Sequence, residues 1–163
     1  MSPTPEQQRF RDGMSRLGAA VNLVTTDGPA GRHGITVSAV CSVTDSPPTL
    51  LVCINRNAFA HDAVRTNGVV CVNVLTGAHR DLSMAFARWT GADRFAGARW
   101  QTLATGAPVL EDAAVAFDCR ITDCRDTGTH AVLFCEIAAT HLPEISEGGL
   151  IWYDRAFHPL EAR

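Results

Sequence analysis

Three hydroxyl side chains and one arginine are the residues most able to do chemistry in this sequence. Thr36, Ser38 and Ser42 fall on one strand-like run, where their hydroxyl groups can donate hydrogen bonds. Arg56 follows the next run, and a guanidinium matches a phosphate group through two parallel hydrogen bonds. These residue types predict a site for a flat ligand that carries a phosphate. The same residues would also suit the solvated end of a β-hairpin.

Small residues on the same run predict close approach of such a ligand to the backbone. Gly34 and Ala39 leave the room that larger side chains would fill. Cys41 lies on this run as well, and its thiol could be a redox group or a packing group. We favour packing, in the core or against the edge of a ring.

Several classes of site are excluded by what the chain lacks. No G-x-G-x-x-G occurs, and the nearest glycine cluster, GPAGRHG, has the wrong spacing for a dinucleotide-binding loop. Every one of the 14 basic residues is arginine, which rules out a lysine Schiff base or a P-loop lysine. The His and Cys spacings fit no zinc site. A net charge of -3 without a basic cluster argues against nucleic acid as a partner.

Length and composition favour one globular domain over residues 1–163. Hydrophobic residues make up 46% of the chain and charged residues 19%. No apolar run reaches the roughly 18 residues of a membrane-spanning helix. The polar start MSPTPEQQRFRDG lacks the apolar core of a signal peptide, so we expect a cytoplasmic protein. In that compartment the six cysteines would stay reduced.

The elements that must position these residues are mainly strands. Thr4 and Pro5 predict the start of a short helix that covers one end of a sheet. Further helical pieces are predicted near 58–66 and at 79–88, and a loop-rich segment at 89–108. Strands are predicted at 19–26, 33–43, 49–54, 69–74, 114–123, 130–140, 151–154 and 156–160.

Hydrophobic patterning predicts how three of these segments are buried. The run TLLVCI at 49–54 is continuous and should be buried on both faces. Residues 115–122 alternate, which predicts Val115, Phe117, Cys119 and Ile121 inward and their neighbours outward. We expect the thiols outside the hydroxyl-bearing run to be core residues, namely Cys53, Cys71, Cys119 and Cys135.

Motifs along nearly the whole chain resemble those of the short-chain flavin reductases. The resemblance rests on the stretch GRHGITVSAVCSVTDSPPTLLVCINR at 31–56, and also on CVNVL at 71–75, RF at 94–95, GAPVLEDA at 106–113, FDCRI at 117–121 and GTH at 128–130. Within that family the chain is most similar to the NADH-dependent FMN reductases of pyrimidine utilisation. The resemblance implies an FMN-binding split β-barrel, a closed antiparallel Greek-key barrel that is usually a homodimer.

The resemblance also implies where the flavin binds. The residues that would line its ring and ribityl chain are Thr36, Ser38, Ala39, Val40, Cys41 and Ser42. Asn55 and Arg56 would hold the ribityl or phosphate end. The following NAFAH at 57–61 lacks the Ser or Thr often found there, so His61 or backbone amides near residue 58 would have to substitute. For His61 itself we favour an ordinary surface helix residue.

Further residues match family positions near the nicotinamide and the ring edge. His130, in GTH, would position the nicotinamide without abstracting a proton, because hydride transfer to a flavin needs no side-chain base on NADH. Phe86 and Arg94 would form a lid or a dimer wall, or pack in the core. Tyr153 could contact a ring and Arg155 a pyrophosphate, though core packing and a surface ion pair account for them equally well.

The resemblance therefore implies an enzyme that oxidises NADH, reduces FMN and supplies the reduced flavin to a partner flavin-dependent monooxygenase, in pyrimidine catabolism. The alternatives are the reductase component of an aromatic hydroxylase and a non-catalytic flavin-binding electron carrier. The carrier would keep the strand from Thr36 to Cys41 but would not need His130.

Overall fold

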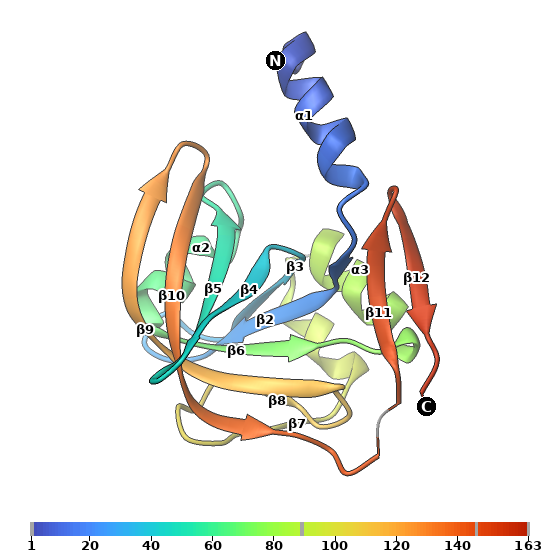
Figure 1. The fold of residues 1–163 in the computed structure, drawn as a ribbon. Coiled ribbons are helices and arrows are strands. Elements are labelled where there is room, and N and C mark those ends of the chain that lie inside the picture. Colours follow the sequence, from blue (N-terminus) through green and yellow to red (C-terminus); the bar gives the residue numbers. More distant parts are fainter. Residues whose placement is uncertain (1, 89, 146, 163) are drawn as a thin grey trace.

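The chain folds into a mainly antiparallel β structure with a few short helices (Figure 1). The computed structural model describes residues 2–88, 90–145 and 147–162. In chain order the elements are α1 (Pro5–Ser15), β1 (Ala19–Ala20), β2 (Asn22–Thr26), β3 (His33–Val37), β4 (Val40–Asp45), β5 (Pro48–Asn55), α2 (His61–Asn67), β6 (Val69–Val74), the 3-10 helix η1 (Gly77–His79), α3 (Arg80–Arg88), the 3-10 helix η2 (Ala92–Gly97), β7 (Trp100–Gln101), β8 (Val109–Leu110), β9 (Val115–Thr127), β10 (His130–His141), β11 (Gly149–Tyr153) and β12 (Ala156–Leu160).

A seven-stranded sheet dominates the fold, in the order β3-β2-β6-β9-β10-β5-β4. All of its pairings are antiparallel. In the described residues no ladder joins the edge strands β3 and β4, so the expected closed barrel is wrong in this respect, whereas the mainly β class is confirmed. The reason lies in the two-residue link between these strands, because the carbonyl of Ala39 accepts from the amide of Cys53 on β5. That bond turns the chain onto β5 and away from β3.

The core consists of two apolar clusters. One lies among β2, β5, β6, β9 and β10 and includes Val24, Val52 and Leu133. The other lies among β2, α3, η2 and β8 and includes Leu23 and Phe86. α3 therefore covers β3 and β2 from outside the sheet, which agrees with the helix predicted at 79–88. Residue 89, in the loop-rich segment predicted at 89–108, lies outside the described residues.

Strand β5 is buried on one face only, so the prediction for residues 49–54 is wrong. Leu50, Val52 and Ile54 are buried, while Leu51 and Cys53 are half-buried. An antiparallel strand presents alternate side chains to opposite faces. The half-buried face of β5 is therefore available to form a wall of a cavity.

Strand β9 also departs from its predicted alternation. Ala116 and Asp118, expected to face outward, are both fully buried. The Asp118 carboxylate accepts hydrogen bonds from the amide of Thr105, at 2.8 Å, and from the Thr105 hydroxyl. A buried charge needs such partners, and these two hold the loop before β8 against the sheet.

Helix α1 does not cover the sheet as predicted. It begins with a capping box between Thr4 and Gln7, projects from the body of the molecule, and contains no buried residue (Figure 1). Two bonds join it to the turn between β11 and β12: the amide of Asp154 donates to the carbonyl of Ser15 at 2.6 Å, and the guanidinium of Arg155 pairs with Asp12. No helix of the described residues is long and apolar enough to cross a membrane.

Candidate functional site

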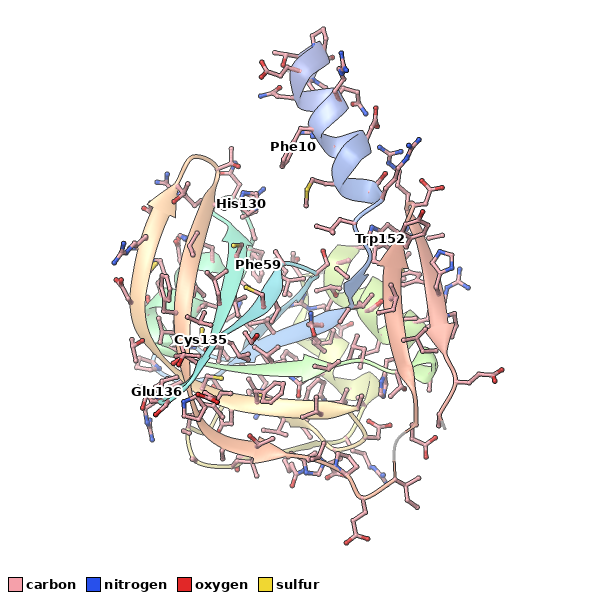
Figure 2. All side chains as sticks on the ribbon, in the orientation of Figure 1. Phe10, Phe59, His130, Cys135, Glu136 and Trp152 are labelled. Atoms are coloured by element: carbon pink, nitrogen blue, oxygen red, sulfur yellow. The ribbon has the colours of Figure 1, made fainter. Side chains whose placement is uncertain are left out.

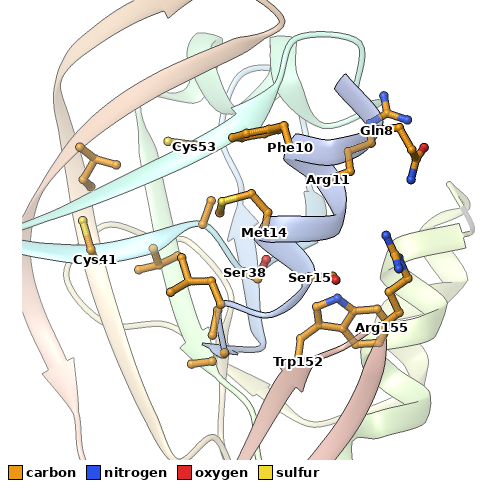
Figure 3. Close-up of a pocket in the computed structure, with 17 residues that line it drawn as sticks. Gln8, Phe10, Arg11, Met14, Ser15, Ser38, Cys41, Cys53, Trp152 and Arg155 are labelled. Atoms are coloured by element: carbon orange, nitrogen blue, oxygen red, sulfur yellow. The ribbon is translucent and has the colours of Figure 1, made fainter. Parts of the chain in front are cut away.

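A groove of about 990 Å³ lies between α1 and the strands β4, β5 and β11 (Figure 3). Phe10 and Met14 point from α1 into it, Cys41 and Cys53 face them from the strands, and Trp152 lies at its base. These five side chains are apolar, aromatic or sulfur-bearing, and Gln8, Arg11 and Arg155 add polar groups to the lining. A wall of this kind suits a flat, largely apolar ring.

The structure brings together four of the six residues predicted to line the ring. Ser38, Ala39, Val40 and Cys41 all line the groove. Ser42 is the next residue of β4, where it is exposed and lies outside the groove lining. This stretch presents backbone and small side chains to the groove, as its composition predicts.

The Thr36 hydroxyl is used within the protein. It donates to the carbonyl of Ser83 on α3 at 2.6 Å, and Thr36 lines a separate cavity of about 220 Å³. Gly34 likewise serves packing, because a Cβ there would approach the ring of Phe86 to 2.7 Å. The room predicted for a ligand at Gly34 is therefore filled by a core aromatic.

A second, polar cavity of about 440 Å³ lies beyond the end of β5. Its lining includes Arg56, Asn57, His61 and Thr129. Arg56 donates to the carbonyl of Gly128 at 3.3 Å and remains about half exposed, with 47% of its side chain accessible. A strand rises about 3.3 Å per residue, so Arg56 lies about 10 Å along the chain from Cys53 in the groove.

His61 is buried, which makes its interpretation as a surface helix residue wrong. Only 7% of the residue is exposed, at the first position of α2. The competing explanation, backbone amides near residue 58, is weakened because the amides of Asn57, Ala58 and His61 donate to Asn55 Oδ1, Asn55 O and Ala58 O. His61 therefore remains a candidate for this cavity, which it lines beside Arg56, Asn57 and Thr129.

His130 lies beside the same strand end. It pairs across the ladder with Asn55, at the register where β10 meets β5. The ring is exposed, and its Nδ1 lies 2.8 Å from the hydroxyl of Thr129. The side chain of Asn55 shapes the loop by accepting from the Asn57 amide. His130, far along the chain, therefore lies beside Asn55, the residue before Arg56, where these two strands end; Figure 2 labels His130 there.

Phe86 belongs to the second core cluster and Arg94 lies against it; neither residue lines the groove. The Phe86 ring meets Phe95 edge to face at 4.9 Å, and the Arg94 guanidinium lies 4.6 Å from the centre of the Phe86 ring. Burial lowers the pKa of Arg94, which is 6% exposed. These contacts favour the packing interpretation of both residues.

Tyr153 and Arg155 mark the tip of the β11–β12 hairpin. Tyr153 is 44% exposed and contacts the ring of His158. Arg155 lines the groove, but its guanidinium pairs with Asp12 of α1. That hydrogen bond lowers the pKa of Asp12. The surface ion pair, and not a bare anion site, is the arrangement present.

Five of the six thiols fall into two groups, and Cys124 is half-buried outside both. Cys41 is exposed and Cys53 half-buried in the groove, so the prediction of Cys53 as core is wrong. Burial raises the pKa of Cys53, and the nearby Cys41 adds to the shift. Cys71, Cys119 and Cys135 are buried as predicted; burial raises the pKa of Cys135 to about 12.

Sequence reasoning missed the part that α1 and β11 play in the groove. Phe10 and Met14 were visible at helical spacing, but a helix with so few apolar positions cannot bury a face against a sheet. That shortage was the available signal. Trp152 gave no signal that distinguished it from its neighbours, because in the WYDR segment the expected ligand contacts were placed on Tyr153 and Arg155.

Comparisons of the sequence and of the structure with known proteins both find flavin reductases. Residues 14–161 match the sequence profile of the family described as flavin reductase like domain. The chain is 55% identical over 156 residues to the FMN reductase (NADH) RutF of Escherichia coli K12 DH10B, an alignment that covers 95% of this chain and 94% of that protein.

Two crystal structures show the same fold. One is a candidate flavin reductase from Haemophilus somnus 129PT, with a TM-score of 0.90, 47% identity, and coverage of 94% of this chain and 98% of that one. The other is BorF, the flavin reductase component of a bacterial two-component tryptophan halogenase, with a TM-score of 0.87, 25% identity, and coverage of 96% and 99%.

Proposed function

Because the chain belongs to the flavin reductase like domain family, we propose that the groove and the polar cavity are the two ends of one FMN site. The protein is an NADH-dependent FMN reductase, as its 55% identity to RutF supports. The reduced flavin goes to a flavin-dependent monooxygenase in pyrimidine catabolism. BorF, the reductase component of a halogenase system, provides a precedent for a separate flavin consumer.

The observation that carries this proposal is the order of two cavities along one strand. The groove contains Cys53 of β5 together with Cys41 and Trp152, and a polar cavity with an arginine and a buried histidine begins just after β5, at Arg56. A flavin mononucleotide has the same polarity from end to end: an apolar ring, a polyhydroxyl chain and a phosphate. The residues present therefore fit the molecule at both ends.

Each group of side chains has a distinct task in this site. Ser38 to Cys41 place backbone and small side chains against the ring and tune it by hydrogen bonds. Arg56 and His61 hold the phosphate. His130 orients the nicotinamide from the strand end beside Asn55. When bound, FMN supplies the hydride-accepting chemistry itself, so the protein contributes orientation and electrostatics.

We also propose that two copies of the chain form a homodimer in the cytoplasm. The strand β4 is almost wholly exposed, and Phe10, Val43 and Phe59 are exposed apolar side chains, of which Phe10 lines the groove. A second copy seated there would remove them from water and enclose the ring. All six cysteines are free, as suits a reducing compartment.

The test is NADH oxidation, followed by loss of its absorbance, with FMN or riboflavin as the acceptor. Arg56→Ala should weaken FMN binding about tenfold or more and leave riboflavin unchanged, because only FMN carries the phosphate. Arg65→Ala is the matched control, since Arg65 pairs with the same Asp126 as Arg56 but lies outside the cavity lining. Equal losses for the two flavins would remove the phosphate role. Tight flavin binding without turnover would favour the electron carrier.

A further inference from the structure

Charge is unevenly distributed in the groove. Arg11 of α1 and Arg155 of the β11–β12 turn line it, and no acidic side chain does so among the residues that the structure describes. Arg155 is paired with Asp12. Arg11 is exposed, and its side chain makes no ion pair or hydrogen bond within the described part of the chain. The groove therefore carries one uncompensated positive charge, in a chain whose net charge is -3.

Arg11 lies on the far side of the groove from the strands that carry the thiols. Figure 3 shows Arg11 and Arg155 on one side and Cys41 and Cys53 on the other. Strand β5 runs on from Cys53 to its end, after which Arg56 lines the polar cavity. In the proposed site Arg56 holds the phosphate of FMN, and the flavin ring itself carries no phosphate. The charge of Arg11 is therefore left for the anion of a second ligand.

The groove also has room for a second ligand. Its volume of about 990 Å³ lies at the upper end of the roughly 300–1,000 Å³ of ligand pockets, and in the proposed site the flavin phosphate lies outside it. His130 pairs with Asn55, which is two residues from Cys53 and so on the same face of β5. Paired residues of an antiparallel ladder share a face. The nicotinamide site proposed at His130 is therefore on the side of the sheet that faces the groove.

We propose that Arg11 binds the pyrophosphate of NADH while His130 orients the nicotinamide. This inference rests on the proposed function. The pyrophosphate carries two negative charges, and a guanidinium donates two parallel hydrogen bonds to phosphate oxygens. Arg11 is a binding residue and touches no reacting atom. Its contact is the same before and during hydride transfer, so it lowers the KM for NADH and leaves kcat unchanged.

The test compares two hydride donors in the presence of FMN. One is NADH, and the other is 1-benzyl-1,4-dihydronicotinamide, which has the reactive ring but no phosphate. After subtraction of the rate without enzyme, Arg11→Ala should raise the KM for NADH by about tenfold and change neither kcat nor the KM for the benzyl compound. Arg9→Ala is the matched control, because Arg9 is an exposed arginine of the same helix and lies outside the groove lining. It should match wild type with both donors.

Binding without turnover gives an independent readout. ADP-ribose has the pyrophosphate and lacks the nicotinamide, so its dissociation constant in titration calorimetry should rise about tenfold in Arg11→Ala and stay constant in Arg9→Ala. Because salt screens a contact between exposed charges, the wild-type constant should also rise with ionic strength, and it should do so less steeply in Arg11→Ala. Arg11→Lys keeps the charge without the planar fork and should bind with intermediate affinity. A purely structural role for Arg11 would give none of these differences.

The outcomes separate this inference from the proposed function. If the wild-type protein oxidises neither donor with FMN present, the proposed function is wrong and the inference falls with it. If it oxidises both, but Arg11→Ala matches Arg9→Ala or slows both donors equally, only the pyrophosphate assignment is wrong. If Arg11→Ala weakens FMN and spares riboflavin, Arg11 holds the flavin phosphate, which also overturns the assignment. The three variants change exposed side chains on a helix that has no buried residue, so the fold does not depend on them.

Discussion

Replacing Arg155 by glycine should weaken flavin binding without weakening the fold. Asp154 and Arg155 occupy the turn of the β11–β12 hairpin with φ of 47° and 62°, a left-handed conformation that non-glycine residues rarely adopt. Each such residue costs about 1 kcal/mol relative to glycine. Removing that strain offsets the loss of the ion pair to Asp12, which is exposed and adds little to global stability. We expect the free energy of unfolding to stay within about 1 kcal/mol of wild type.

The effect on flavin comes from α1. The helix has no buried residue, and the Asp12–Arg155 pair is one of its two bonds to the hairpin turn. Loss of the pair frees the helix that carries Phe10 and Met14 on the groove wall. If these two side chains together lose about 60 Å² of apolar surface to the ring, their contribution at about 25 cal/mol per Å² is about 1.5 kcal/mol. That corresponds to roughly tenfold in the dissociation constant.

Asp154→Gly is the matched control for this experiment. It relieves the neighbouring left-handed residue and keeps both the Asp12–Arg155 pair and the backbone bond from residue 154 to Ser15. Flavin fluorescence titration gives the dissociation constants, urea unfolding the stabilities, and trypsin cleavage within α1 its attachment. Arg155→Gly should be cleaved faster and bind flavin less well, and Asp154→Gly should match wild type in both. Equal flavin binding by the two variants would refute the reasoning.

Three further predictions concern other parts of the molecule. His130→Ala should raise the KM for NADH by more than it weakens FMN binding, as steady-state kinetics beside a flavin titration would show; equal damage to both would contradict the nicotinamide role. Gly34→Ala should lower the free energy of unfolding by about 1–3 kcal/mol, because the new Cβ meets the Phe86 ring at 2.7 Å; a smaller residue at position 86 should restore part of the loss in urea unfolding. Thiol labelling at mildly alkaline pH should modify Cys41 first and Cys53 more slowly, because burial raises the pKa of Cys53, and FMN should protect both; labelling unaffected by FMN would place the ring elsewhere.

The groove strand was predictable because its evidence is local. Small residues from Ser38 to Cys41 mark a backbone that a ligand can approach, and all four line the groove, whereas Arg56 lines the polar cavity. The same local evidence misled at Thr36, since its hydroxyl donates to Ser83, which lies far along the chain. A sequence shows which side chains can donate, but only tertiary packing decides to what.

Non-local pairing accounts for most of what the sequence could not predict. The open edge between β3 and β4 goes with the hydrogen bond from the Cys53 amide to the Ala39 carbonyl. The burial of Asp118 depends on the loop at Thr105, whose amide donates to the carboxylate. The interpretation of His61 as a surface residue was wrong because the residue is buried. The cavity that it lines also includes Thr129, from the turn between β9 and β10. None of these partners lies within a helical turn or strand repeat of the residue concerned.

Alternate residues of strand β5 are under different evolutionary constraints, because one set packs in the core and the other faces the groove. Leu50, Val52 and Ile54 belong to the core, so substitutions there are selected through stability. Leu51 and Cys53 face the groove, and changes at these positions can alter how a ring is held without disturbing that core. A lineage could therefore drift toward a different flavin preference by substituting alternate residues of one strand. In deep mutational scanning, substitutions at Leu50, Val52 and Ile54 should lower expression, whereas substitutions at Leu51 and Cys53 should lower activity with little effect on expression.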